Sequence, residues 1–199
     1  EFYYNDSKQN LRDLITDSDH SRAFTIGLNK LFNTNKKNSY YEVKWEWTQL
    51  EQTGSRKVRD AGSWYMHYRV YDGYTNRGEV LGAGIGPGSN SQFISISKIN
   101  ERSKIGLAFE TIDNDNDFYY YAFADSSDYR RYWKDFNFHI NFDKEFENFW
   151  ASINLIFSRS LNYQWELERT NPNGAEYYYP GEDTNNLHFD IKITYPLNF

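Results

Sequence analysis

The C-terminal stretch, residues 186–199, alternates without exception between apolar and polar positions. Apolar residues stand at every odd position, from Leu187 to Phe199, and polar residues or proline stand at every even position. Successive side chains of a β-strand point to opposite faces, so this pattern predicts a strand with one apolar and one polar face. A half-buried strand of a soluble sheet shows the pattern over about 5–6 residues, whereas a tilted strand that crosses a bilayer needs roughly 9–11. The length therefore favours a strand of a membrane barrel, with a soluble sheet as the alternative.

The final residue, Phe199, is an aromatic residue of the apolar face. Together with Tyr195 and Leu197 it resembles the C-terminal signal strand by which outer-membrane barrels are recognised for insertion. We therefore expect Tyr195, Leu197 and Phe199 to act as a membrane-insertion signal. The expected partners of this strand are the barrel assembly machinery and the lipid of the outer membrane.

Composition agrees with a membrane barrel better than with a soluble domain. Aromatic residues make up 20% of the chain although the mean hydropathy is −0.88, and barrels combine a polar lumen with aromatic girdles. No run of about 18 apolar residues occurs, so the sequence predicts no transmembrane helix. The net charge of −6 and the pI near 5.3 argue against nucleic acid as a partner. The lack of cysteine excludes disulfide frameworks and thiolate metal sites.

Two-faced strands are predicted throughout the chain, separated by polar turns and loops. Phe2–Tyr4 looks like the end of a strand already under way, and further strands are predicted over residues 21–32, 41–48, 63–71, 93–99, 104–111, 133–142 and 149–167. We find no repeat, low-complexity tract or linker, so residues 1–199 are expected to form one all-β domain. The predicted fold is an antiparallel transmembrane outer-membrane β-barrel, to which this chain contributes about 8–10 C-terminal strands. The N-terminal strands and the signal peptide are expected to lie outside it.

Loop lengths predict the orientation of these strands, because the periplasmic turns of such barrels are short and the external loops are long. With the C-terminus in the periplasm, the segments expected outside are 72–92, 112–132 and 169–185, and the turns expected inside are 100–103 and 143–148. The rule then fails, since it places the longer loop 52–62 in the periplasm and the short turn 33–39 outside. Two explanations remain open: a missed short strand near residues 74–81, or a segment 72–92 that folds into the lumen.

Residues 72–92, which we call the glycine segment, include Gly82, Gly84, Gly86 and Gly88. Glycine permits backbone angles and close approaches that other residues forbid, so we interpret the segment as a structural plug or tight loop rather than a binding surface. The spacing is not G-x-G-x-x-G, and no Gly-Lys-Ser/Thr follows, which argues against a nucleotide motif.

The glycine segment also carries a family resemblance. Trp64-Tyr65, followed by the run from Gly73 to Gln92, resembles the capsule assembly proteins of the Wzi type, in the form of their Bacteroidetes relatives. Residues 114–120 and 162–164 look like later landmarks of the family, and the resemblance covers the chain from about residue 40 onward.

This resemblance implies a large monomeric outer-membrane barrel of about eighteen strands when complete, with a periplasmic helical part outside this chain. It implies a place in the outer membrane of a Gram-negative bacterium. It further implies a lectin-like role in holding or organising capsular or another surface polysaccharide, without catalysis and without a cofactor. The resemblance aligns no individual sugar-binding residue.

Sugar recognition needs flat aromatic faces, with amides and carboxylates that hydrogen-bond to hydroxyl groups. The segments expected outside supply this mixture around residues 74–77, 113–121 and 171–179, and arginines would suit an acidic capsule. The candidate glycan-binding residues are Tyr74, Asn76, Arg77, Asn114, Asn116, Asp117, Tyr119, Tyr120, Arg130 and Arg131. For the tyrosines, an interfacial girdle is the alternative interpretation.

Residues 113–117 alternate aspartate and asparagine, a composition typical of a calcium loop; we call them the acidic run 113–117. An EF-hand that starts at Asp113 would need Gly and Glu where Phe118 and Ala124 stand, so the run is not an EF-hand. We predict a solvated turn there, with a looser calcium site left open, and no metal is expected elsewhere. The four histidines are scattered, no Gly-x-Ser-x-Gly elbow occurs and no carboxylates are paired, so we expect no enzyme activity.

Two other functions compete with a glycan-binding barrel. A general porin or glycan channel would have the same strands and a polar lumen of mixed charge, and it differs in whether the glycine segment and the external loops close the pore. A soluble β-sandwich adhesin would bury the apolar faces of its strands against each other. The pairing of two faces this rich in Phe and Trp argues against the sandwich.

Overall fold

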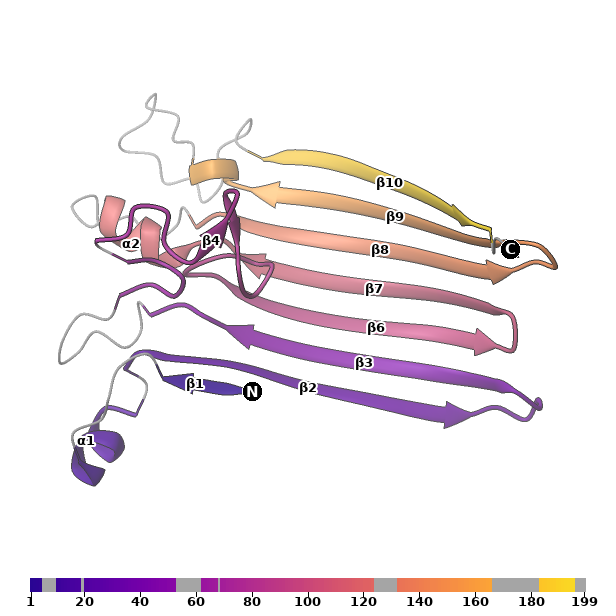
Figure 1. The fold of residues 1–199 in the computed structure, drawn as a ribbon, viewed down its shortest axis with the longest axis horizontal. Coiled ribbons are helices and arrows are strands. Elements are labelled where there is room, and N and C mark those ends of the chain that lie inside the picture. The colour runs from indigo at the N-terminus through magenta and orange to yellow at the C-terminus, as the bar shows by residue number, and fades with distance from the viewer. Residues whose placement is uncertain are drawn as a thin grey trace, which may run out of the picture.

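The computed structural model describes residues 1–4, 10–18, 20–52, 62–67, 69–123, 132–165 and 183–195. Within them, one sheet of eight strands has the order β1-β2-β3-β6-β7-β8-β9-β10 (Figure 1). Its strands are β1 (Phe2–Tyr4), β2 (Arg22–Asn33), β3 (Ser39–Gln49), β6 (Asn90–Asn100), β7 (Ser103–Asp113), β8 (Lys134–Glu145), β9 (Trp150–Leu161) and β10 (Thr184–Thr194). All neighbours are antiparallel, which confirms the predicted antiparallel β-structure. β1 and β10 are the edges of this sheet, which does not close on itself.

Shorter elements gather at one end of the sheet (Figure 1). They are the hairpin of β4 (Thr75–Asn76) and β5 (Glu79–Val80), the helices α1 (Leu11–Thr16) and α2 (Asn116–Phe123), and the 3₁₀ turn η3 (Tyr163–Trp165). The expectation of an all-β chain is therefore wrong for the residues of α1 and α2. In the part of the chain that the structure describes, no helix is long and apolar enough to cross a membrane.

One face of the sheet, which we call the apolar face, carries aliphatic and aromatic side chains across its whole width. The pairing register places Trp45 of β3 between Leu28 of β2 and Ile94 of β6, and this row continues across the sheet. These side chains stay exposed, with 64% of Leu28 and 58% of Phe189 accessible. The large exposed residues of this face are Ile26, Leu28, Phe32, Tyr41, Trp45, Trp47, Ile94, Ile96, Ile105, Leu107, Phe109, Phe138, Phe157, Leu187, Phe189, Ile191 and Ile193.

On the central strands, polar residues of the apolar face lie toward the strand ends. In β6, Ile94 and Ile96 stand between Gln92 and Lys98. The ammonium group of Lys98 lies 5.9 Å from the centroid of the Tyr41 ring. A lysine near the end of a strand can keep its charge in water while its methylene groups cover apolar surface. The apolar side chains of these strands therefore form a central band with polar flanks.

The opposite face, which we call the polar face, carries serine, threonine, asparagine and charged residues. Glu42 of β3 accepts a hydrogen bond from Lys104 of β7 (3.0 Å) and forms an ion pair with Lys44 (3.3 Å). Polar and apolar positions alternate in the last strand as predicted, up to Thr194. The two faces of the sheet therefore differ in the way that the sequence pattern indicates.

The predicted strand over residues 63–71 is wrong. Trp64 and Tyr65 form a turn in which Tyr65 has a φ of 65°, and β3 pairs directly with β6. Without this strand, the loop-length rule holds for the described strands. The short connections at one end are 34–38, 101–102 and 146–149, and the long connections at the other end are 50–89, 114–133 and 162–183 (Figure 1). Short strands do occur near residues 74–81, but β4 and β5 pair in a sheet of their own, so a missed strand does not explain the failure of the rule.

Two strands end at other residues than the sequence predicts. β9 stops at Leu161 and η3 follows, so the predicted continuation is wrong as far as residue 165, and residues 166–167 lie outside the described residues. β10 ends at Thr194, and residues 196–199 of the predicted last strand lie outside the described residues.

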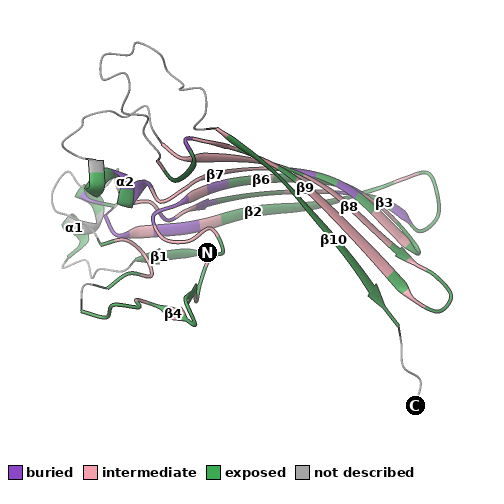
Figure 2. Cartoon of the chain, turned by 90° about the horizontal axis from the view of Figure 1, so that it is seen from above, coloured by how far each residue is buried: buried purple, intermediate pink, exposed green. Residues whose placement is uncertain are grey.

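Several of the most buried side chains gather near α2, at the end of the sheet with the long connections (Figure 2). Leu50, Gln52, Ser89, Asp117 and Tyr119 are buried there. Since neither face of the sheet is covered along its length, this end is where the chain is most tightly packed.

Candidate functional site

A pocket of about 1150 Å³ lies between the polar face and residues 64–85. One wall is formed by polar-face residues of β2, β3, β6 and β7, and the opposite wall by Trp64, Tyr65, Tyr74 and residues 81–85. Tyr3 of β1 contributes a further aromatic side chain. We call this space the sheet pocket. Figure 2 shows the β4 region to one side of the sheet.

The sheet wall contains a row of three larger side chains. The register places Phe93 of β6 between Glu46 of β3 and Glu110 of β7. Glu110 accepts a hydrogen bond from the Nδ2 of Asn137 (3.1 Å) and lies 3.7 Å from the Nε2 of His139. Glu46 makes no hydrogen bond or ion pair with another described residue. An aromatic ring is thus flanked by two carboxylates, one of which is free.

Tyr65 holds the opposite wall together. Its carbonyl accepts a hydrogen bond from the N–H of Tyr74 (2.8 Å), and its hydroxyl accepts one from the N–H of Ala83 (3.1 Å). Gly82 packs directly on the ring of Tyr65, so that a Cβ atom at this position would overlap the ring. The β4–β5 hairpin is therefore fixed to Tyr65 at both of its ends.

The Gly82→Ala variant is expected to destabilise this wall by about 1–3 kcal/mol, because a Cβ at residue 82 forces Tyr65 to move. Gly84→Ala is the matched control, since a Cβ at residue 84 meets nothing within 4 Å. Hydrogen exchange of the Ala83 amide, which donates to Tyr65, measures the difference. Equal exchange in the two variants would contradict the role of Tyr65.

The structure separates the three predicted glycan-binding residues of the glycine segment. Tyr74 lines the sheet pocket and is 62% exposed. Asn76 and Arg77 are exposed on the β4–β5 hairpin, and neither lines the pocket. Tyr74 is therefore the member of this group that the fold places at the site.

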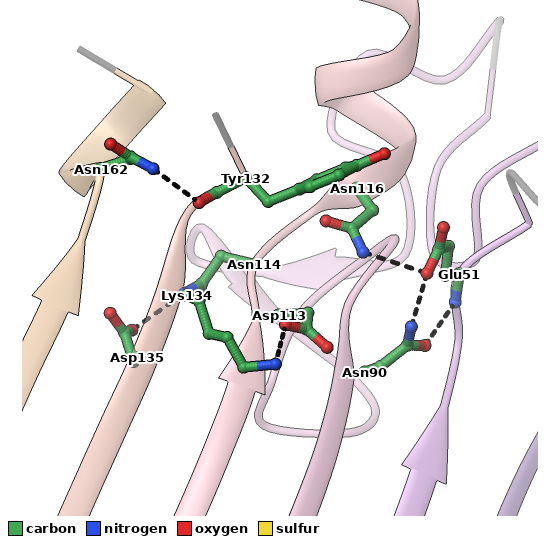
Figure 3. Close-up of polar contacts among 9 residues, drawn as sticks. All are labelled: Glu51, Asn90, Asp113, Asn114, Asn116, Tyr132, Lys134, Asp135 and Asn162. Atoms are coloured by element: carbon green, nitrogen blue, oxygen red, sulfur yellow. Dashed lines mark hydrogen bonds and ion pairs between the residues drawn. The ribbon is translucent and has the colours of Figure 1, made fainter. Parts of the chain in front are cut away.

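Asn114 and Asn116 connect loops to one another. Asn116 donates a hydrogen bond to Glu51 (3.0 Å), and Asn90 donates to the same carboxylate oxygen (Figure 3). Asn114 donates to Asp135 (2.9 Å). These bonds join the long connections to β6 and β8, so both amides already have protein partners.

Asp117 is fully buried at the start of α2. Its carboxylate accepts hydrogen bonds from the backbone N–H of Gln52 (2.9 Å) and from the hydroxyl of Ser63 (3.0 Å). The neighbouring N–H of Asn116 donates to the carbonyl of Gly88 (2.9 Å). We call these three contacts the α2 latch, because they tie the helix to both ends of the connection 50–89.

The tyrosines of α2 differ in exposure. Tyr119 is buried, and its ring centroid lies 4.8 Å from that of Tyr132. Tyr120 is 39% exposed and contacts Tyr121 edge to face. Tyr119 is therefore a packing residue, whereas Tyr120 is partly exposed. Arg130 and Arg131 lie outside the described residues.

The acidic run 113–117 is not a solvated turn, so that prediction is wrong. Asp113 forms an ion pair with Lys134 (2.9 Å), and Asp115 accepts a hydrogen bond from the N–H of Phe118 (3.0 Å) at the start of α2. Asp117 is held in the α2 latch. Among the described residues, no group of three or more histidines and carboxylates is placed to hold a metal ion.

Burial raises the pKa of the Asp115 carboxyl above its ordinary value; the N–H of Phe118 lowers it, and the charge of Asp117 raises it further. The folded protein therefore keeps this proton where the unfolded chain has already released it. The stability that the group contributes is fully present below the ordinary aspartate pKa, and it is lost as the pH rises through the raised pKa.

The Asp115→Asn variant is expected to remove this loss and to be more stable than the wild type at neutral pH. Asparagine keeps an oxygen for the Phe118 N–H and tolerates the φ of 36° at this position. Chemical unfolding of both proteins from about pH 3 to about pH 7 measures the difference. A variant that is less stable than the wild type at neutral pH would contradict the assignment.

The four glycines of the proposed structural segment have different surroundings. Gly82 and Gly84 line the sheet pocket, and Gly86 has a φ of +81°. Gly88 has a φ of +61°, and a Cβ there would collide with Asp115. Of the three residues of the proposed insertion signal, Tyr195 is 62% exposed and its ring centroid lies 5.5 Å from that of Phe149. Leu197 and Phe199 lie outside the described residues.

Sequence reasoning missed Tyr65, Phe93 and Glu110 as pocket residues. A signal existed for Tyr65, because residues 63–71 carry aromatic side chains at both odd and even positions, unlike a two-faced strand. Phe93 stands among serines at the polar positions of β6, which is a similar signal. Glu110 has no local signal, because its place in the row depends on pairing across strands.

Comparison with known proteins finds no matching family model, no matching curated protein and no matching solved structure. The chemistry of the sheet and of the sheet pocket therefore carries the functional argument.

Proposed function

We propose that this chain forms part of the wall of an outer-membrane β-barrel, and that this barrel binds a surface polysaccharide without catalysing a reaction. The sheet pocket is the proposed binding site. Capsular polysaccharide is the first ligand to test, because of the resemblance of the glycine segment to Wzi-type capsule assembly proteins.

The observation that carries the membrane assignment is the exposed apolar face. Soluble monomers rarely expose contiguous apolar patches beyond a few hundred Å². Here the patch runs across seven adjacent long strands. In the proposed barrel, the hydrocarbon chains of the membrane lipid cover this patch and remove it from water. Strands of 11 or 12 residues meet the length that a tilted membrane strand requires. Short connections at one end and long ones at the other agree with an outer-membrane orientation.

The sheet pocket supports glycan binding. Tyr3, Trp64, Tyr65, Tyr74 and Phe93 supply aromatic surface on which sugar rings can stack. Carboxylates of the sheet wall can accept hydrogen bonds from sugar hydroxyls, and its serine and threonine hydroxyls can both accept and donate them. A second wall lies opposite part of the polar face, and it favours retention of a ligand over free passage of solute; it consists of Trp64, Tyr65, Tyr74 and residues 81–85.

Titration of the full-length protein in lipid nanodiscs with purified capsular polysaccharide tests this function. We expect saturable binding that Tyr74→Ala weakens about threefold to tenfold through loss of aromatic stacking. Asn76→Ala is the matched control, because Asn76 lies on the same hairpin outside the pocket, and it should leave binding unchanged. Absence of binding, together with steady conductance in a planar bilayer, would overturn the proposal and favour the alternative function, a porin or glycan channel.

A further inference from the structure

The ionisable side chains of the sheet pocket are unusual in their charge. Among the described residues, its lining includes the carboxylates of Glu46 and Glu110 and no lysine, arginine or histidine; Glu1 adds a third carboxylate together with an ammonium group, which donates to the carbonyl of Thr25 (2.7 Å). Arg77, the cation expected for an acidic capsule, lies outside the lining on the β4–β5 hairpin. The field inside the pocket is therefore negative, and it disfavours sugars that carry carboxylate or phosphate groups.

The nearest lysines of the polar face pair with another carboxylate. Lys44 lies two residues before Glu46 on the same face of β3, and it pairs with Glu42, as does Lys104 of β7. Glu110 accepts a hydrogen bond from Asn137. Glu46 has no partner of either kind among the described residues, and Gly27 beside it carries no side chain that could cover it. One carboxylate is thus left exposed to a ligand.

The row Glu46–Phe93–Glu110 is wide enough to hold one sugar ring on Phe93 between the two carboxylates. Neighbouring strands lie about 4.8 Å apart, so the backbone positions of the two glutamates are separated by about 10 Å, and Phe93 lies between them. A ring that stacks on Phe93 brings its substituents to a carboxylate on either side. Aromatic faces attract cations as well as C–H groups. Phe93, with Tyr65 and Tyr74 across the pocket, therefore adds to the preference for positive charge.

We propose that the sheet pocket binds a sugar residue that carries a protonated amino group, with Phe93 under the ring and Glu46 as the partner of the ammonium group. This proposal rests on the proposed function and names its ligand class, a basic amino sugar. It also changes the expectation that arginines bind an acidic capsule.

Three hexasaccharides of equal length test it: an oligomer of glucosamine, which is cationic, one of N-acetylglucosamine, which is neutral, and one of galacturonate, which is anionic. Calorimetric titration of the full-length protein should find the glucosamine hexamer bound most tightly. Glu46→Gln should weaken that binding about tenfold, through loss of a charge-assisted hydrogen bond, and should change the affinity for the N-acetylglucosamine hexamer less than twofold.

Glu79→Gln is the matched control for general electrostatic attraction, because it removes the same charge from an exposed position of β5 outside the pocket. Equal effects of Glu46→Gln and Glu79→Gln would overturn the proposal. Equal or tighter binding of the neutral or the anionic hexamer would also overturn it. If capsular polysaccharide binds while no hexamer does, the amino-sugar assignment fails and glycan binding stands. If the polysaccharide fails as well, the proposed function itself is lost.

Discussion

Replacing Leu155 with arginine is expected to lower the free energy of unfolding in a phospholipid bilayer by about 2–4 kcal/mol. Leu155 lies in the middle of β9 on the apolar face, between Ile140 of β8 and Phe189 of β10. In the proposed barrel this position faces hydrocarbon, where the guanidinium group loses its hydration and finds no carboxylate partner. Equilibrium denaturation of the full-length protein in vesicles measures the change.

Asn154→Arg is the control for this experiment, because it adds the same charge at the neighbouring position on the polar face. The register places residue 154 between Asn141 and Asp190, so the new cation gains a carboxylate neighbour. We expect a change within about 0.5 kcal/mol. Similar losses in the two variants would contradict a lipid-facing apolar face. A wild-type protein that stays folded and monomeric without lipid or detergent would contradict it too.

The Asp117→Ala variant is expected to lower the free energy of local opening of residues 62–89 by about 2–4 kcal/mol. The change removes the acceptor for the N–H of Gln52 and the hydroxyl of Ser63, and it leaves a buried donor without a partner. Hydrogen exchange of the Gln52 amide and limited proteolysis of residues 62–89 measure the opening.

Asp117→Asn separates the hydrogen bond from the packing. Asparagine is the same size and keeps an oxygen to accept from the Gln52 N–H, so its effect should be clearly smaller than that of alanine. Equal opening in the two variants would show that the α2 latch depends on the charge of Asp117 rather than on its hydrogen bonds. Unchanged opening in both variants would contradict a role of the α2 latch in holding residues 62–89.

The strands could be predicted from sequence because their signal is local. Strict alternation located β2, β3, the β6–β7 hairpin and β8 to within a few residues, and it separated the two faces correctly. The error at residues 63–71 has a physical reason. A short run of mixed aromatic residues meets the composition of a strand, while the turn at Tyr65 is decided by contacts with Gly73, Tyr74 and Ala83.

The site was less accessible to sequence reasoning because its contacts are distant in the chain. Asn116 and Asp117 look like solvated amide and acid groups, yet their partners Glu51 and Gln52 lie 65 residues away. The free carboxylate of Glu46 and its place beside Phe93 follow from the register of three strands. Tyr74 belongs to the predicted set because it is an aromatic residue of a segment expected outside, whereas its position in the lining of the sheet pocket depends on the contacts of residues 74 and 83 with Tyr65.

The α2 latch has a consequence for the order in which the chain assembles. Three of the seven connections between neighbouring strands are turns of two to five residues, and the longest of the other four joins β3 to β6 through residues 50–89. Closing this longer loop costs about 2–3 kcal/mol more in chain entropy than closing a tight hairpin. The contacts that fix both ends of this loop come from Asn116 and Asp117, which follow β7 in the chain. The wall of the sheet pocket opposite the sheet can therefore be fixed only after β6, β7 and the start of α2 have formed. We therefore expect the pocket to form late in folding rather than to act as a folding nucleus.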